Sequence, residues 1–369
     1  MKTTLEYYDI FPKILCTERE AEITIRPLGV HAAFDEKKKY RVKIIPMNET
    51  LLNCSDKGYE ALDVQHCNEN LQFRYRFTQE EQYVVLLQIQ EDGVWTNCCE
   101  LRVYSVKPDY FKLRPYRGDM HCHTCRSDGK EGPAIVAANY RKSGFDFLSI
   151  TDHGQYEPAQ EAIRAFSDIP MSFQLFAGEE VHPPKNNCHT VHFGGTYSIN
   201  QIFREDPEKY EREVDEIENK LEIPEGLNTR EYASLLWVYR NIREAGGMAI
   251  MAHPCWIQDE AYHIRRDMYR YLLQTHPFDA LELTCGQSLE ENQLQISLWQ
   301  QMREEGNVVP VVGSSDSHGT VNSPWFGLSK MIVLSEECTK DALKSAPCGC
   351  TGTVSGGTTS KSIWREQST

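Results

Sequence analysis

The first 115 residues carry short runs in which apolar and polar residues alternate. Alternation with a period of two is typical of β-strands that bury one face. Polar, turn-rich pieces separate the runs, and no long helical period occurs in this part of the sequence. The pattern predicts a small all-β, sandwich-like domain over residues 1–115. The expected strands are residues 20–27, 40–46, 71–77, 82–90 and 99–106.

The role of this domain is open between two interpretations. It could be a docking or substrate-binding module, or it could be a packing partner for the rest of the chain. The second interpretation is favoured, because β-sandwiches carry no default function. Residues 107–117, which include two prolines, are the expected linker.

From residue 116 onward, apolar runs alternate with helical segments. This alternation predicts an α/β domain over residues 116–346, with a parallel sheet covered by helices and either open or closed into a barrel. The seven expected strands are residues 118–123, 145–153, 173–180, 190–197, 247–253, 280–284 and 308–318. The expected helices are residues 132–143, 158–166, 229–245, 261–275 and 289–305.

Two stretches depart from the alternation. Residues 203–226 form a strongly acidic insertion, which is either a lid beside the site or a solvated amphipathic helix. Residues 347–369 are rich in Gly, Ser and Thr, offer little to bury, and are expected to be a disordered tail.

Charge and composition exclude several classes of protein. The formal net charge of −15 argues against binding of long nucleic acids, although bound metal ions would reverse the local sign for a small phosphorylated substrate. No apolar run is long enough for a membrane helix, and no signal-peptide pattern is present. Thirteen scattered cysteines are therefore expected to be reduced thiols of a cytoplasmic protein. The oligomeric state is left open.

Residues that commonly bind metals end several of the expected strands. His121 and His123 stand two residues apart in the first strand, and Asp316 and His318 repeat that spacing in the last. The strands between them end in the same kinds of residue, which are His153, Glu180 and His253. Because α/β enzymes build their sites at the carboxyl ends of their strands, these side chains are expected to converge. Mixed imidazole and carboxylate ligands suit Zn, Mn or Fe.

The motifs HCHTCRSDG, FDFLSITDHG, GEEV, GGMAIMAHP and GSSDSHG resemble, in order, those of the PHP (polymerase and histidinol phosphatase) superfamily of metal-dependent phosphoesterases. The resemblance covers roughly residues 116–345. It implies a distorted seven-stranded (β/α)7 barrel and a site for three divalent ions. The ligands that it implies are His121, His123, Asp128, His153, Glu180, His253, Asp316 and His318. A ninth ligand is His189 or His192, and the spacing to Gly194 favours His189.

The resemblance implies hydrolysis of a small phosphate mono- or diester, such as a nucleotide, a sugar phosphate or a short oligonucleotide, by a metal-activated hydroxide. Two alternatives stay open: a hydrolase of carboxyl or carbamate esters, and a non-catalytic metal-binding module. His182 and His192 are the candidate proton donors. The candidate substrate-binding residues are Lys130, Arg265, Arg266 and Trp256.

Overall fold

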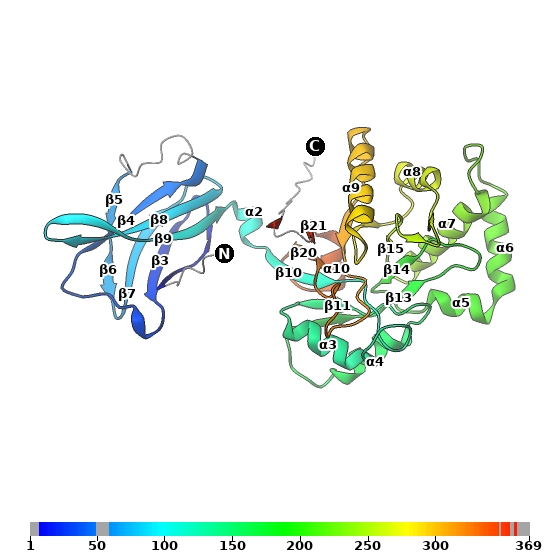
Figure 1. The fold of residues 1–369 in the computed structure, drawn as a ribbon, viewed down its shortest axis with the longest axis horizontal. Coiled ribbons are helices and arrows are strands. Elements are labelled where there is room, and N and C mark those ends of the chain that lie inside the picture. The colour runs from blue at the N-terminus through cyan, green and yellow to red at the C-terminus, as the bar shows by residue number, and fades with distance from the viewer. Residues whose placement is uncertain (1–6, 49–58, 347, 355–357, 360–369) are drawn as a thin grey trace. The chain divides into compact units, whose positions relative to one another are not determined.

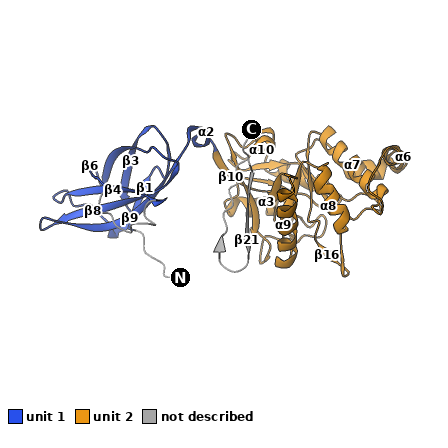
Figure 2. Ribbon diagram, turned by 90° about the horizontal axis from the view of Figure 1, so that it is seen from above, with its two compact units in different colours: residues 1–113 blue, residues 114–369 orange. Residues whose placement is uncertain are grey.

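The computed structural model describes residues 7–48, 59–346, 348–354 and 358–359. The chain divides into two compact units, Met1–Leu113 and Arg114–Thr369 (Figure 2). Each unit has its own hydrophobic core. Among the described residues, no helix combines the length and apolar character that a membrane span requires.

The first unit consists of two β-sheets with a shared core. Alternate side chains of three strands are buried between them, among them Ile23, Val42 and Val85. One sheet has the order β1 (Tyr8–Phe11), β3 (Glu20–Pro27), β7 (Asn70–Arg76), β6 (Gln65–Cys67). The other has the order β2 (Ile14–Cys16), β9 (Val94–Val106), β8 (Glu81–Glu91), β4 (Tyr40–Pro46), β5 (Ala61–Asp63). The N-terminal region is thus all-β, as the alternation indicates.

The strands of the second unit form two larger sheets (Figure 1). One has the order β12 (Gln174–Phe176), β11 (Phe147–Ser149), β10 (Arg114–Asp119), β20 (Ser329–Ser335), β21 (Cys348–Val354), β22 (Thr358–Thr359). The other has the order β13 (Gly178–Val181), β14 (Thr190–Phe193), β15 (Met248–Met251), β18 (Ala280–Thr284), β19 (Val311–Gly313). A separate hairpin joins β16 (Ile257–Gln258) to β17 (Ala261–Tyr262).

Two isolated bridges link the sheets: Cys122 pairs with Ser317, and His153 pairs with Glu180. The hydroxyls of Thr284 in β18 and Ser329 in β20 also form a hydrogen bond between the sheets at 2.8 Å. The described strands therefore form a mixed α/β fold with two linked sheets. The prediction of a fully parallel sheet is wrong at β14, which runs antiparallel to β13 and to β15. The connection over residues 182–189 is too short for the crossover that a parallel neighbour requires.

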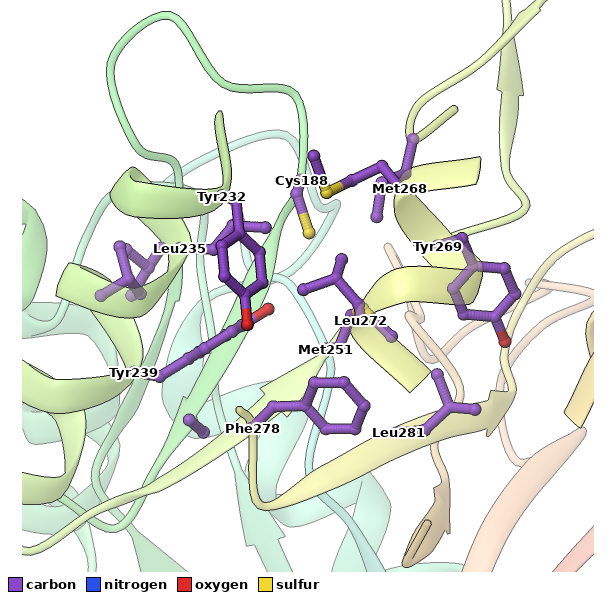
Figure 3. Packing of buried hydrophobic residues seen from close by; sticks show 14 of the residues in the cluster. Cys188, Tyr232, Leu235, Tyr239, Met251, Met268, Tyr269, Leu272, Phe278 and Leu281 are labelled. Atoms are coloured by element: carbon purple, nitrogen blue, oxygen red, sulfur yellow. The ribbon is translucent and has the colours of Figure 1, made fainter. Parts of the chain in front are cut away.

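Helices cover the sheets and bury most of the remaining apolar residues. They are α3 (Pro133–Lys142), α4 (Glu157–Ala165), α5 (Ile199–Glu205), α6 (Pro207–Glu218), α7 (Thr229–Glu244), α8 (Arg266–Thr275), α9 (Leu289–Glu304) and α10 (Lys340–Ser345). Figure 3 shows the largest cluster, in which Tyr239 of α7 and Leu272 of α8 lie near Phe278, which precedes β18, and Leu281 of β18. Burying each such side chain contributes roughly 1.5–3 kcal/mol. This cluster holds β15 and β18 in place.

Three segments differ from expectation. Helix α8 begins at Arg266 rather than at residue 261, because Asp259 and Glu260 adopt positive φ and turn the chain into the β16–β17 hairpin. Residues 348–354 of the expected tail form β21, since the backbone of β20 offers hydrogen bonds whatever the side chains are. The rest of that tail lies outside the described residues, apart from β22.

The acidic insertion forms α5 and α6. Tyr210 and Val214 of α6 are buried in the core that it shares with α7. Arg230 of α7 forms ion pairs with carboxylates of α6, and Trp237 donates a hydrogen bond to Glu213 at 2.7 Å. These contacts match the amphipathic-helix interpretation of residues 203–226.

Candidate metal centre

The strand ends of the second unit bring eight of the predicted ligands into one cluster. His121 and His123 follow β10, His153 follows β11, and His253 follows β15. Both bridges between the sheets fall within this region. The remaining members are Glu180 in β13, His189 before β14, and Asp316 and His318 after β19.

Glu180 lies at the centre of the cluster and is fully buried. Its Oε1 atom is 2.9 Å from His189 Nδ1 and 3.2 Å from His253 Nε2. Its Oε2 atom is 2.5 Å from His153 Nδ1 and 3.6 Å from His123 Nε2. One carboxylate thus faces imidazoles that come from four different strands.

Asp316 forms a second carboxylate contact in the cluster. Its Oδ1 atom lies 2.9 Å from His123 Nε2 and 3.3 Å from His121 Nε2. The backbone of Asp316 has a φ of 47°, and that of His253 has a φ of 23°. Such conformations cost about 1–3 kcal/mol in a non-glycine residue, and they cluster at functional sites.

A more exposed group of ligands surrounds Asp128. Its Oδ2 atom is 3.4 Å from His153 Nε2, and its Oδ1 atom is 3.3 Å from His318 Nε2. His318 Nδ1 donates to the carbonyl of Asp316 at 2.9 Å, which turns its Nε2 toward Asp128. His123 joins the group, with its Nδ1 4.0 Å from Asp128 Oδ1.

The unpaired atoms of the buried residues fit a metal ion. His121 Nε2, both ring nitrogens of His123, Glu180 Oε2 and Asp316 Oδ1 are buried, and among the described residues none has a partner in hydrogen-bond geometry. Leaving such atoms unsatisfied is costly. Two ligands that each bind one ion at about 2.1 Å lie about 3 Å apart. The observed separations of 2.9–3.6 Å are of that size.

The charges of the cluster compensate one another. Burial alone would lower the pKa of His121, but the carboxylates of Asp316, Glu282 and Glu180 raise that pKa well above its ordinary value. Burial would raise the pKa of Glu180, but the imidazoles of His189 and His121 hold it well below the usual range. Either a proton on His121 or a bound cation would balance these carboxylates.

Two further carboxylates support the ligands and were missed from the sequence. Glu282 accepts a hydrogen bond from His121 Nδ1 at 2.9 Å and from the His253 amide at 3.0 Å. Asp119 accepts from the amides of His121 and Ser315, each at 3.1 Å. The signal for Glu282 was a lone carboxylate inside the apolar strand ALELT. By donating from Nδ1, His121 presents Nε2 to the cluster.

Asp152 fixes the loop that carries Asp128. It accepts hydrogen bonds from the Thr124 amide at 2.9 Å, the Thr124 hydroxyl at 2.8 Å and the Ser127 hydroxyl at 2.6 Å. It therefore positions residues 124–128 and takes no place among the ligands.

His192 and Glu179 face away from the cluster. His192 Nδ1 lies 3.4 Å from Glu179 Oε1, and the ring packs against Gly195 and Gly247. Glu179 also accepts from the Ser198 hydroxyl at 2.7 Å. Since β14 places His189 and His192 on opposite sides, the structure brings only His189 to the cluster. His192 is not retained as a proton donor.

A cavity of about 500 Å³ opens beside the cluster. His182, the other candidate donor, lines it and lies 2.9 Å from His153 Nδ1 through its Nε2 atom. His263 also lines it, and its Nδ1 donates to the Asn187 carbonyl at 3.1 Å. Sequence reasoning missed His263, because it lies in no motif. Trp256 is not among the residues that line the cavity, but its ring centre lies 4.1 Å from that of His263 and 5.4 Å from that of His253.

The candidate phosphate anchors lie outside this cavity. The described residues that line it include no lysine and no arginine. Arg265 forms an ion pair with Asp267, and Arg266 is exposed at the start of α8. Lys130 is exposed near the Asp128 group, and its amide donates to the His318 carbonyl at 2.9 Å.

Comparisons with known proteins add the following. No protein-family model matches the chain. The DNA polymerase/3'-5' exonuclease PolX of Bacillus subtilis (strain 168) is 35% identical over 57 residues, which cover 15% of this chain and 10% of PolX. The chain thus matches only a tenth of the length of this curated relative.

The solved structures that resemble the chain include the following two. One is a two-domain protein from Bacteroides vulgatus ATCC 8482 that contains a predicted PHP-like metal-dependent phosphoesterase, with 14% identity, a TM-score of 0.45, and coverage of 65% of this chain and 66% of that one. The other, from Bifidobacterium adolescentis ATCC 15703, is described as a metal-dependent phosphoesterase, with 20% identity, a TM-score of 0.39, and coverage of 55% and 88%. Structural neighbours of the chain are PHP-like metal-dependent phosphoesterases.

Proposed function

We propose that the second unit is a metal-dependent hydrolase that cleaves a small phosphate ester. The observation that carries the proposal is the set of buried imidazole and carboxylate atoms around Glu180 and Asp316, which lie about one ligand–ligand distance apart and lack hydrogen-bond partners among the described residues. Divalent ions, such as Mn, Fe or Zn, supply Lewis acidity and an activated water in sites of this kind.

The ligand atoms fall into overlapping groups that could hold up to three ions. His121 and His123 share Glu180 as a neighbour, and His123 also belongs to the group around Asp128. His189 and His253 face the Oε1 atom of Glu180, as His121 does, whereas His123 faces the Oε2 atom. Glu180 would therefore help to hold the ions, and Glu282 holds His121 in the tautomer that would bind through Nε2. As part of the same proposal, we interpret the two linked sheets as the distorted barrel that the motif resemblance implies.

The cavity supports an uncharged leaving group. It is lined by amide side chains, histidines, Tyr262 and the carboxylate of Asp259, and none of the described residues along it is a lysine or an arginine. Ions held by the metal ligands would thus neutralise the phosphoryl charge. A sugar or a base of limited size would lie in the cavity. The net charge of −15 opposes the approach of a long nucleic acid.

The test compares phosphate monoesters and diesters with aryl carboxyl esters, using protein loaded in turn with Mn, Fe(II) and Zn. We expect phosphate release that disappears, together with bound metal, when His121→Ala is combined with Asp316→Ala. His192→Gln is the control matched for burial, and it should keep its metal content. Hydrolysis of carboxyl esters without phosphate release would reject the phosphoesterase assignment.

A further inference from the structure

Cys98 and Cys99 lie at an irregularity of the first unit. The register of β8 with β9 pairs Gln88 with Asn97 and Leu87 with Cys99, so Cys98 is the extra residue of a β-bulge. Adjacent side chains of a regular strand point to opposite faces. The bulge interrupts this alternation at Cys98 and Cys99, and each of the two thiols shifts the pKa of the other. The bulge thus turns two neighbouring cysteines into a dithiol.

The dithiol is accessible and has defined neighbours. Cys98 is exposed, Cys99 is half-buried at the edge of the core, and both are free thiols. Tyr8 lowers the pKa of Cys98, and the Tyr8 ring stacks on Phe34 with the ring centres 4.9 Å apart. The charged groups that face the thiols are Glu91 and Glu100, and Lys38 is paired with Glu91 at 2.7 Å.

The interaction between the two thiols makes Cys98 the more acidic of the pair. The Cys99 thiol lowers the pKa of Cys98 to about 7, although burial opposes this effect. The pKa of Cys99 is raised in turn, mainly by the Cys98 thiol and by burial. A thiolate is the nucleophilic form of cysteine, so the pair combines an attacking sulfur with a second sulfur on the adjacent residue.

A disulfide is a poor product for this pair. The Cα atoms of adjacent residues are about 3.8 Å apart, whereas disulfides usually span about 4.4–6.8 Å between Cα atoms. If both sulfurs bind one soft atom instead, no sulfur–sulfur bond has to form across this short Cα–Cα distance. Soft thiolate ligands select soft partners.

We propose that Cys98 and Cys99 form a dithiol site that chelates thiophilic centres of the trivalent arsenoxide class. Each thiol forms one arsenic–sulfur bond, and the arsenoxide oxygen leaves as water with the two thiol protons. No electrons are exchanged. This site is independent of the metal-ligand cluster in the second unit.

The experiment treats the full-length, reduced protein with phenylarsine oxide and measures intact mass and the modified peptide. We expect one equivalent on the peptide that contains residues 98 and 99. Because the second sulfur acts at high effective concentration, Cys98→Ser and Cys99→Ser should each weaken binding roughly a hundredfold. Cys67→Ser, which removes a lone thiol of the same unit, and Cys125→Ser, which removes an exposed one of the other unit, should not.

A release assay on the unaltered protein distinguishes two-sulfur from one-sulfur binding. The adduct should resist an excess of a monothiol, such as 2-mercaptoethanol, and should be removed by 2,3-dimercaptopropanol. Release by the monothiol, or an adduct that maps to other cysteines, would overturn the proposal. Thermal melting of each variant shows whether a loss of binding reflects unfolding.

Discussion

Glu282 is not one of the predicted ligands, but it orients two of them through hydrogen bonds. It binds the ring of His121 and the backbone of His253 at once, and it is fully buried. Removing a carboxylate behind a ligating histidine typically costs 10–100-fold in metal affinity. We therefore expect Glu282→Gln to weaken metal binding about 10–100-fold, as measured by competition with a chelator.

Glu179→Gln is the matched control for this substitution. Glu179 is also a buried carboxylate, but it faces Ser198 and His192 on the other side of β13. Its loss should lower the melting temperature without lowering the metal affinity of the folded protein. Equal affinities for the Glu282→Gln variant and the unaltered protein would show that Glu282 does not orient His121.

The pH dependence of the cluster should reverse when metal binds. Burial opposes the charged forms, but neighbouring carboxylates raise the pKa of His121, and neighbouring imidazoles lower those of Glu180 and Asp316. The contribution of His121 is complete below an unfolded-state pKa of about 6.5 and fades as pH rises through the folded value, whereas His123 and His189, whose pKa values are lowered, act in the opposite direction. The carboxylate contribution is complete above about pH 4 and fades as pH falls through the folded value.

The cluster should thus stabilise the metal-free protein most between about pH 4.5 and 6.5. Metal ions need neutral imidazoles, so the stabilisation that they add should grow from about pH 6 to 8. Melting curves with a chelator and with Mn across that range measure both trends. A metal effect that shrinks with rising pH would contradict the ligand assignment.

At the scale of elements, β10 and β11 set the position of the first ligands. Gly118 pairs with Phe147, and a Cβ at Gly118 would lie 1.9 Å from the Phe147 ring. Gly118→Ala should therefore displace β10, with a cost of about 1–3 kcal/mol from overpacking. Because His121 and His123 follow this strand directly, metal affinity should also fall.

Gly132→Ala provides the comparison, because a Cβ at Gly132 meets no atom within 4 Å. Chemical denaturation and a metal titration on both variants measure the two effects. If Gly118→Ala kept full stability and affinity, the tight contact between β10 and β11 would not control the ligand positions.

The elements also show which parts of the fold can be predicted from sequence. Strand β3 follows the alternation residue by residue, and β4 follows it from Tyr40 to Ile44, because one face of each is buried in the sandwich core. The reversal of β14 could not be predicted from periodicity, which carries no strand direction. Glu282 was missed for a related reason: its role arises from contact with His121, 161 positions away in the sequence. Short motifs identify the ligands, but not the residues that orient these ligands through hydrogen bonds.

For the whole molecule, metal binding should act on one unit and leave the other unchanged. The ligands all belong to Arg114–Thr369, and the sandwich of Met1–Leu113 has a separate core. A ligand that binds only the folded state adds about 2.7 kcal/mol at a hundredfold excess over Kd. Calorimetry of the full chain should therefore show a transition of the second unit that moves up with Mn and down with a chelator, while a transition of the first unit stays fixed.

The variant that combines His121→Ala with Asp316→Ala should lose the metal-dependent shift but keep the fixed transition. If both transitions moved together with metal, the two units would not be energetically independent, and the effect of metal could not be assigned to the cluster alone.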